Sequence, residues 1–259
     1  MKVTLNKIYW VLREQVGIDP LKFLRFLFRI FPFIILYYKY KKASNENVVF
    51  FPCLHDFYAN CGESSSEYFW QDLLVARLIY KFNPINHLDI GSRLDGFIAH
   101  VASFRKIEVA DIRPLNNSIP NVSFYELDIM KNLSEDMLET YESISCLHAI
   151  EHFGLGRYGD PITNNGYEIA IQNISKMIKK NGKLFLSTPS GKKRVEFNSN
   201  RVFDPIELLN ICKSNGLELC NFYSMDNDYN CHSDEDLVGQ LSKYQEKDYS
   251  LIVYEFRKK

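Results

Sequence analysis

Short apolar runs alternate with longer amphipathic stretches from residue 85 onward, and this alternation constrains the fold more than any other feature. Seven runs have the length and composition of strands: INHLDI, KIEVADI, NVSFYELDI, SISCLHAI, GKLFLST, GLELCNFYSM and YSLIVYEF. Stretches with helical spacing lie around residues 93–104, 166–179 and 204–214, and another, 64–82, precedes the first run. This order predicts an α/β fold with a mostly parallel sheet and helices on both faces. A polar segment without a clear helix separates the last two runs, so we expect an antiparallel C-terminal edge strand.

The first 65 residues differ in composition from the rest, and we expect a helical N-terminal extension over residues 1–65 and the α/β domain over 66–259. Residues 1–43 contain nine lysines and arginines against two acids. Within residues 20–43, aromatic and basic residues are mixed, and Lys22, Arg25 and Arg29 share one helical stripe. The cations and an interruption at Pro32 make this segment a poor membrane span. A membrane surface or a glycosyltransferase partner fits it better, and packing on the main domain is the alternative.

The bulk composition excludes some classes of protein. A formal net charge of −1 argues against a nucleic-acid-binding protein. The six cysteines form no C-x-x-C pair, which indicates reduced structural thiols in a cytosolic protein. No cleavable signal peptide is apparent in the first residues. We therefore expect a cytoplasmic protein, peripheral at the inner face of the membrane if its N-terminal segment binds there.

Acidic residues stand at the ends of three successive strand candidates. Asp89 precedes Gly91 in HLDIGSRLDGF, Asp111 ends KIEVADI, and Asp128 ends NVSFYELDI. In a parallel sheet these ends meet at one edge, where ligands bind near the reversal of strand order. Gly91 permits a tight turn, Asp111 stands where an acid binds ribose hydroxyls, and Asp128 where an acid faces an adenine amine. Because Asp95 would repel pyrophosphate, an adenosine cofactor without phosphate is favoured over a dinucleotide.

A loop rich in ionisable groups follows the fourth strand candidate. The segment LHAIEHFGLGRYGDP contains His148, Glu151, His152 and Asp160. A neutral histidine can accept the proton of an attacking hydroxyl group, and His152 is the first candidate for this base and His148 the second. Glu151, Asp160 and either histidine could instead hold a divalent metal ion, which we do not favour because the spacing is not H-E-x-x-H. Alternatively, His148 lies against the adenosine without a catalytic role.

The strand-end acids resemble the binding site of class I S-adenosylmethionine-dependent methyltransferases. Four positions match the family's pattern: Asp89, Gly91, Asp111 and Asp128. Two later glycines of that pattern are replaced by Arg93 and Asp95, and Gly96 is displaced by one residue. The resemblance implies a Rossmann-like methyltransferase sheet and S-adenosylmethionine as the cofactor. The cofactor site it implies consists of Asp89, Gly91, Ser92, Asp111, Ile112, Asp128, Ile129 and His148.

Four longer sequence segments show a closer resemblance to one protein family. DIGSRLDGFIAHVASF, ADIRPL, LHAIEHFGLGRYGDP and EFNSNRVFDP look like domain-of-unknown-function family 268, a divergent branch of the methyltransferase superfamily. Its members are often encoded with bacterial surface-polysaccharide enzymes, and the likeness covers roughly residues 50–205. It implies methylation of a hydroxyl group on a glycan, a lipid-linked glycan or a nucleotide-sugar, in the synthesis of O-antigen or capsule.

Two segments are expected to form the acceptor side of the site. Arg157 and Tyr158 come from the loop after the fourth strand, and Phe197, Asn198 and Arg201 follow the fifth. If the altered glycine loop does not bind the cofactor, the alternative is a non-catalytic scaffold of the same fold in a glycan assembly complex. A nucleotide-sugar-modifying enzyme that uses a dinucleotide is the weaker alternative.

Overall fold

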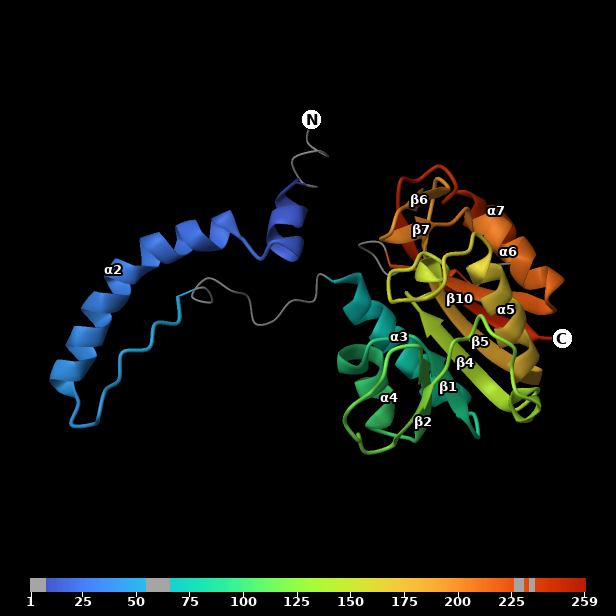
Figure 1. Cartoon of the computed structure of the whole chain (residues 1–259), viewed down its shortest axis with the longest axis horizontal. Helices are drawn as coiled ribbons and strands as arrows, with labels where there is room; N and C mark the ends of the chain where they lie inside the picture. Colours follow the sequence, from blue (N-terminus) through green and yellow to red (C-terminus); the bar gives the residue numbers. More distant parts are fainter. Residues whose placement is uncertain (1–7, 55–65, 226–230, 233–235) are drawn as a thin grey trace. The chain divides into compact units, whose positions relative to one another are not determined.

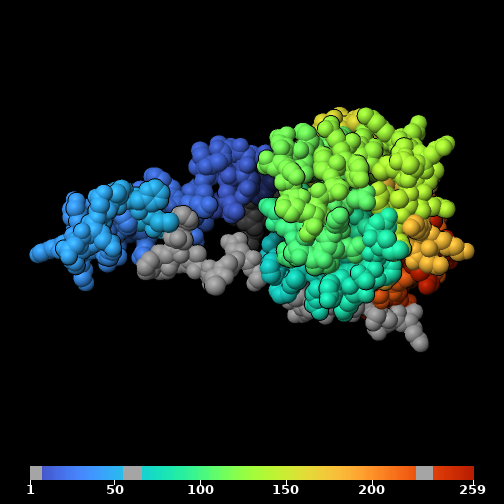
Figure 2. All heavy atoms as spheres, turned by 90° about the horizontal axis from the view of Figure 1, so that it is seen from below, coloured from blue at the N-terminus to red at the C-terminus, as the bar shows by residue number. Residues whose placement is uncertain are grey.

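The chain forms two compact units, Met1–Glu63 and Ser64–Lys259. The computed structural model describes residues 8–54, 66–225, 231–232 and 236–259. Figures 1 and 2 show both units, coloured from blue at the N-terminus to red at the C-terminus. The domain boundary expected after residue 65 lies outside the described residues and stays a prediction.

The first unit contains a 24-residue helix, α2 (Pro20–Ala43), which follows a short π-helix, η1 (Val11–Gln15). Asp19 caps α2 because its carboxylate accepts hydrogen bonds from the amides of Leu21 and Lys22, both at 3.0 Å. Proline at the first helical position has a backbone angle already suited to a helix. No described residue of α2 is buried.

The interruption expected at Pro32 is wrong, because α2 continues through this residue to its end. Pro32 removes one N–H donor, but the helix is exposed and can bend to relieve the contact with the preceding turn. Residues after the helix return along it, and the ring of Phe50 lies 5.3 Å from that of Phe33 and 5.2 Å from that of Tyr37. Within the described part of the chain, no helix has both the length and the apolar character needed to cross a membrane.

The second unit contains an eight-stranded sheet with the order β3–β2–β1–β4–β5–β10–β8–β9. Its strands are β1 (His87–Ile90), β2 (Ile107–Asp111), β3 (Val122–Glu126), β4 (Tyr141–Leu147), β5 (Ile178–Ser190), β8 (Leu217–Ser224), β9 (Cys231–His232) and β10 (Ser250–Lys258). The first five pair in parallel, and β10 is antiparallel to both β5 and β8. A separate hairpin consists of β6 (Arg194–Glu196) and β7 (Asn200–Val202).

Helices cover both faces of this sheet (Figure 1). The helices on the first face are α3 (Glu67–Phe82), η2 (Leu94–Ile98, a π-turn) and α4 (Ala99–Ala102), and those on the second are α5 (Gly166–Met177), α6 (Pro205–Ser214) and α7 (Leu237–Ser242). Alternate strand residues supply the two cores: Val109 packs in the first and Ala110 in the second. Burial of these two apolar layers is the main stabilising contribution.

The fold predicted from the sequence is confirmed. All seven strand candidates belong to the main sheet, which is mostly parallel with antiparallel pairing at its C-terminal end. The structure adds that the last strand, β10, inserts between β5 and β8. The hairpin β6–β7 and the short helix α7 were not expected. Because β1 to β4 are parallel, their carboxyl ends meet at one edge, beside the reversal of strand order between β1 and β4.

Candidate active site

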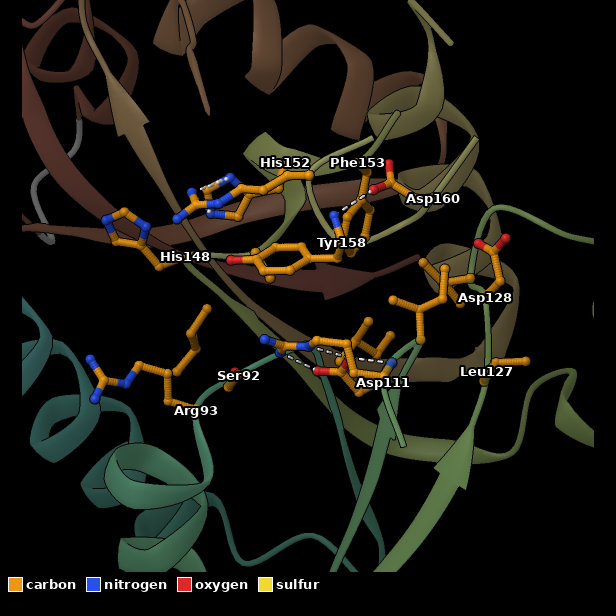
Figure 3. Close-up of a pocket in the computed structure, with 18 of the residues that line it drawn as sticks. Ser92, Arg93, Asp111, Leu127, Asp128, His148, His152, Phe153, Tyr158 and Asp160 are labelled. Atoms are coloured by element: carbon orange, nitrogen blue, oxygen red, sulfur yellow. Dashed lines mark hydrogen bonds and ion pairs between the residues drawn. The ribbon is translucent and has the colours of Figure 1, made fainter. Parts of the chain in front are cut away.

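A pocket opens at this edge of the sheet (Figure 3). It is lined by the turn after β1, the residues after β2 and β3, the loop after β4 and the first turns of α3. Most of the predicted site residues line it: Gly91, Ser92, Asp111, Ile112, Asp128, Ile129, His148, His152, Arg157, Tyr158 and Asp160. Most of the residues predicted for the cofactor and for catalysis therefore share one cavity, which Asp89 and Glu151 do not line, and their individual roles stay predictions.

The turn after β1 requires glycine at position 91. Gly91 has a φ of +75°, and a Cβ atom at this position would lie 3.0 Å from the Cβ of Ala149. The Gly91 amide donates to the carbonyl of Ala110 at 2.9 Å, which ties the turn to β2. The bare backbone of this turn lines the pocket, so a ligand can approach it closely.

Asp89 lies below this turn and is fully buried. Its carboxylate accepts hydrogen bonds from the amide of Ser92 (3.0 Å), the hydroxyl of Ser92 (2.7 Å) and the hydroxyl of Ser145 (2.5 Å). Burial raises the pKa of Asp89 to about 7, although these donors act in the opposite direction. The three strand-end carboxylates therefore do not converge as expected: Asp89 points inward and holds the turn, and it does not line the pocket.

Asp111 lines the pocket at the end of β2, where its carboxylate is paired with Arg113. The Arg113 amide, Nε and Nη2 donate to this carboxylate at 2.8, 2.9 and 2.6 Å. A carboxylate offers about four lone-pair sites, so Asp111 can accept a further hydrogen bond. A ribose at this position would meet the carboxylate with the guanidinium beside it.

Asp128 and Ile129 follow β3 and form the next part of the lining. The carboxylate of Asp128 accepts from the amide of Met130 at 3.0 Å and lies 3.9 Å from Nζ of Lys131. Ile129 is buried, and Ile112 lines the pocket with it. Ile112 and Ile129 form an apolar wall beside the Asp128 carboxylate, and a flat heterocycle with a hydrogen-bond donor at its edge can bind to this combination.

Of the two residues that replace the expected glycines, Arg93 lines the pocket and Asp95 does not. Arg93 and Asp95 form an ion pair, with Nη2 2.8 Å from Oδ2, and both side chains are more than half exposed. Gly96, the displaced glycine, lies in η2, where a Cβ atom would come within 2.3 Å of the buried carboxylate of Asp72. This glycine therefore makes room for an acid that also lines the pocket.

His148 and Glu151 form a buried ion pair on the opposite side of the pocket. Nδ1 of His148 contacts a carboxylate oxygen of Glu151, and its Nε2 lies 3.5 Å from the carboxylate of Glu67. Burial lowers the pKa of His148, but the two carboxylates outweigh burial and raise it to about 10. Burial raises the pKa of Glu151, and the charge of His148 outweighs it, so the carboxyl is ionised. A protonated His148 argues against its predicted role as a base.

His152 is oriented by a backbone carbonyl. Its Nδ1–H donates to the carbonyl oxygen of Ser199 at 2.7 Å, so Nε2 is the unprotonated nitrogen of the neutral ring. Burial lowers the pKa of His152, Glu151 opposes this, and the charge of Arg157 lowers it further. The ring is therefore neutral at pH 7, and its Nε2 lies 3.7 Å from Glu151. His152 has the tautomer and protonation state that a general base needs.

Asp160 holds the loop after β4 in shape. Its carboxylate accepts from the backbone amides of Gly154 (2.7 Å), Gly156 (3.3 Å) and Tyr158 (3.2 Å). These amides take up both oxygens, so the structure does not bring Asp160 into a group of possible metal ligands. A group of this kind among the described residues is His148, Glu151 and His152, whose ligand atoms lie within 4.8 Å of one another.

Tyr158 lies across the pocket, between the histidines and Asp111 (Figure 3). Its ring is edge-on to that of His152 at 5.6 Å, and the guanidinium of Arg113 lies 4.5 Å from the ring centre. Arg157 lies 5.2 Å from the same ring and donates to the Ser199 carbonyl at 2.9 Å. The structure therefore places two acceptor-side candidates, Arg157 and Tyr158, in the cavity.

The other acceptor-side candidates do not line this pocket. Arg201 is buried, and its guanidinium donates to three backbone carbonyls of the loop after β4 at 2.6 to 3.3 Å. Phe197 and Asn198 are exposed at the turn between β6 and β7. Phe197 and Arg201 line a neighbouring hollow instead. Arg201 thus positions the loop that carries the histidines.

Four residues of the site were not expected from the sequence: Glu67, Tyr68, Arg113 and Ser199. The Tyr68 hydroxyl lies 3.3 Å from Nδ1 of His148, and the two rings are 4.5 Å apart. Tyr68 precedes His148 by 80 residues, so no local pattern links them. Arg113 could have been predicted from the sequence, since it stands two residues after the strand-end acid Asp111. Ser199 acts through its carbonyl, which no side-chain pattern reveals.

A family model covers more than half of the chain. The sequence model of a family described as "Caenorhabditis protein of unknown function, DUF268" matches residues 100–256. A search of the curated proteins gives no match.

Three solved structures illustrate the fold. The 1,6-didemethyltoxoflavin-N1-methyltransferase of Burkholderia thailandensis, with S-adenosylhomocysteine bound, has a TM-score of 0.54 and 12% identity, over 75% of this chain and 79% of that one. The N-methyltransferase NodS of Bradyrhizobium japonicum WM9, also with S-adenosylhomocysteine, has a TM-score of 0.52 and 15% identity, over 77% and 93%. The cyclase SpnF has a TM-score of 0.51 and 14% identity, over 72% and 81%. These likenesses show the methyltransferase fold, and the cyclase illustrates that this fold also carries other chemistry.

Proposed function

We propose that the chain, which belongs to the DUF268 family and has the fold of S-adenosylmethionine-dependent methyltransferases, transfers a methyl group from S-adenosylmethionine to a hydroxyl oxygen. The observation that carries the proposal is one cavity with two chemically different sides. Gly91, Asp111 and Asp128 line one side, and His148 and His152 line the other.

The first side suits an adenosine with a positive sulfonium and no phosphate. Gly91 leaves the backbone open to close approach, and Asp111 and Asp128 offer acceptors for ribose hydroxyls and an adenine amine. A pyrophosphate would instead meet the carboxylates of Asp72, Asp111 and Asp128, and the repulsion disfavours a dinucleotide. The same carboxylates are compatible with a sulfonium.

The second side suits removal of a proton from the acceptor. Bound S-adenosylmethionine supplies an electrophilic methyl group and leaves as S-adenosylhomocysteine. The acceptor oxygen must give up its proton as the new C–O bond forms and the S–C bond breaks. Nε2 of His152 carries no proton and can accept this one, because Nδ1–H donates to the Ser199 carbonyl. Tyr158 lies between the two sides, so it must shift when both ligands are present.

For the acceptor we propose a sugar hydroxyl in a bacterial surface glycan, carried on a lipid or a nucleotide. The resemblance of the sequence to polysaccharide-associated proteins supports this choice. The rings of Tyr68 and Tyr158 line the histidine side, and each has an apolar body with a polar tip, as recognition of a sugar requires. Arg157, at the exposed rim, suits the phosphate of a carrier.

Two measurements test this function. The surface glycan of a host that expresses the chain is compared by mass spectrometry with that of a host lacking it, and we expect one additional methyl unit. With extracted acceptor, the purified chain should release S-adenosylhomocysteine. An unchanged glycan and no release from any carrier-linked acceptor would contradict O-methylation.

A non-catalytic scaffold is the second candidate, and one observation favours it. The carboxylate of Asp111 is already held by three donors of Arg113, so the ribose position is partly occupied from within the chain. Calorimetry separates the candidates, because a scaffold that has lost the cofactor should give no heat with S-adenosylmethionine or S-adenosylhomocysteine at high micromolar concentration.

A further inference from the structure

We propose that His148, Glu151 and His152 bind one divalent transition-metal ion on the acceptor side of the pocket. The sequence alone did not favour a metal, and the ligand set considered there included Asp160, whose carboxylate instead accepts hydrogen bonds from backbone amides of the loop after β4. The set that the structure assembles has two imidazoles and one carboxylate, with one ligand atom of each within 4.8 Å of the others. Such a set suits zinc, iron or manganese.

The nitrogens that face the shared position are Nδ1 of His148 and Nε2 of His152. The first contacts Oε1 of Glu151, and the second lies 3.7 Å from it. Ligand atoms around one ion lie about 3 Å apart, because each is about 2.1 Å from the ion. Only small shifts of these three side chains are needed to bring their ligand atoms around one ion. The ion would replace the proton between His148 and Glu151.

The other nitrogen of each ring has an acceptor, as in protein metal sites. Nδ1–H of His152 donates to the Ser199 carbonyl at 2.7 Å, and Nε2 of His148 lies 3.5 Å from the carboxylate of Glu67. Partners of this kind fix the ring orientation and make the facing nitrogen a better ligand. Both histidines are thus oriented for coordination.

Glu151 provides an independent observation. Its side chain is fully buried, and Oε2 has no hydrogen-bond partner among the residues that the structure describes. A buried carboxylate oxygen without a donor is costly, and a cation is the partner that relieves it. Arg157, whose Nη1 lies 3.5 Å from Nε2 of His152, is exposed and can move aside.

A bound ion would change the part that His152 plays. Three protein ligands leave positions open toward the pocket, where the acceptor hydroxyl can coordinate. The ion would lower the pKa of this hydroxyl, which would release its proton to solvent before attack, and His152 would be a ligand instead of the base. This consequence rests on the proposed function, whereas the binding of the ion does not.

The test uses the full chain, stripped with EDTA and titrated with Co²⁺ as the probe. We expect one Co²⁺ per chain, with visible absorption bands of a nitrogen- and oxygen-ligated ion. His148→Asn, Glu151→Gln and His152→Asn should each weaken Co²⁺ binding at least tenfold. His100→Asn is the matched control, because His100, in α4, bonds the backbone carbonyl of Gly96 and lies outside this cluster; this variant should bind Co²⁺ like the wild type.

Two further readouts keep the result interpretable. Thermal melting of the same samples shows whether each variant is folded, and calorimetry with S-adenosylhomocysteine tests the cofactor site separately. If the ligand variants do not fold, Co²⁺ should still raise the melting temperature of the wild type, since a ligand that binds only the folded state stabilises it. No Co²⁺ uptake and no change in melting temperature, or folded ligand variants that bind like the wild type, would overturn the metal site.

A different observation supports a second proposal: the exposed face of α2 binds a surface of anionic phospholipid. Leu24, Phe28, Phe31 and Ile35 are spaced four, three and four residues apart and so share one stripe. They are 49%, 78%, 71% and 68% exposed. A continuous exposed apolar stripe of this kind marks an interaction site.

The charge of α2 identifies the kind of partner. Lys22, Arg25 and Arg29 form a second stripe, Lys39, Lys41 and Lys42 follow, and the helix contains no acid. Each cation near an anionic membrane strengthens binding, and the apolar stripe adds burial in the interface. Phe50 covers a different face, at Phe33 and Tyr37, and leaves the apolar stripe exposed. The mixture of aromatics and cations fits a lipid interface better than a protein groove.

Flotation of the full chain with lipid vesicles tests this proposal. We expect binding to phosphatidylcholine vesicles that contain phosphatidylglycerol, much weaker binding without it, and weakening by salt. Phe28→Glu/Phe31→Glu should reduce binding at least tenfold. Ile85→Glu is the matched control, since Ile85 is 83% exposed but lies in the second unit. No flotation with anionic vesicles would overturn the proposal and point to a protein partner, and equal flotation of the double variant would overturn it by showing that lipid binds outside the apolar stripe.

Discussion

Replacement of Asp111 by alanine gives the sharpest test of the cofactor side. Its carboxylate accepts three hydrogen bonds from Arg113, at 2.6 to 2.9 Å, and is only 12% exposed. Loss of a charged acceptor strands the ribose hydroxyls, which costs about 1–3 kcal/mol. At 1.4 kcal/mol per tenfold, Asp111→Ala should raise the Kd for S-adenosylhomocysteine by about 5- to 150-fold.

Arg113 complicates this variant, because its guanidinium would be released into a pocket that must hold a sulfonium. Arg113→Met separates the two effects: it keeps the carboxylate and removes the competing cation, so we expect unchanged or tighter binding. The double variant Asp111→Ala/Arg113→Met should bind as weakly as Asp111→Ala if the ribose contact dominates. Asp95→Ala is the matched control, since this exposed acid does not line the pocket and should alter Kd by no more than about twofold.

Isothermal titration calorimetry on the full chain measures these affinities, with thermal melting to confirm the fold. Wild-type affinity in Asp111→Ala would remove this carboxylate from the site. Recovery of affinity in the double variant would show that the freed guanidinium, and not a lost ribose contact, caused the defect.

Three further predictions follow from the turn after β1 and from the histidine side. Gly91→Ala should lower the free energy of unfolding by about 1–2 kcal/mol, from the φ of +75° and the contact with Ala149, and denaturant unfolding would measure it. His152→Ala should keep S-adenosylhomocysteine binding but lower turnover by roughly 10²- to 10⁴-fold, and a near-normal rate would remove His152 from the chemistry. Burial raises the pKa of Asp89 to about 7, so from about pH 4 to 7 the folded state binds more protons than the unfolded state. The free energy of unfolding therefore decreases as the pH rises through this window. Asp89→Asn should remove this slope from pH-dependent unfolding curves, and an unchanged slope would show that Asp89 is ionised throughout.

The fold was predictable because its main signal is periodic. Each apolar run has the length of a strand, and parallel strands bring their ends together, so the neighbourhood of Asp111, Asp128 and His152 follows from topology. The direction of Asp89 did not follow, because β1 is buried on both faces and its neighbours look alike in sequence. The role of Arg201 was hidden for a related reason, since its partners are backbone carbonyls of a distant loop.

The contacts of His148 show a second limit of sequence reasoning. Its protonation depends on Glu67, which lies on α3 before the first strand, as well as on the neighbouring Glu151. The pattern of the loop made both histidines candidates for a base, with His152 ranked before His148, but it did not predict their protonation states. Two carboxylates beside His148 keep it protonated. His152, whose Nδ1–H donates to a backbone carbonyl, is neutral because burial lowers its pKa.

A crystal structure of the full chain grown with S-adenosylhomocysteine tests the central claim most directly. We predict density for the adenosine between the Gly91 turn, Asp111 and Asp128, with its sulfur directed toward His152. A pocket still filled by Tyr158 and Arg113, or a ligand bound elsewhere, would contradict the proposed cofactor site and leave the methyltransferase fold without its chemistry.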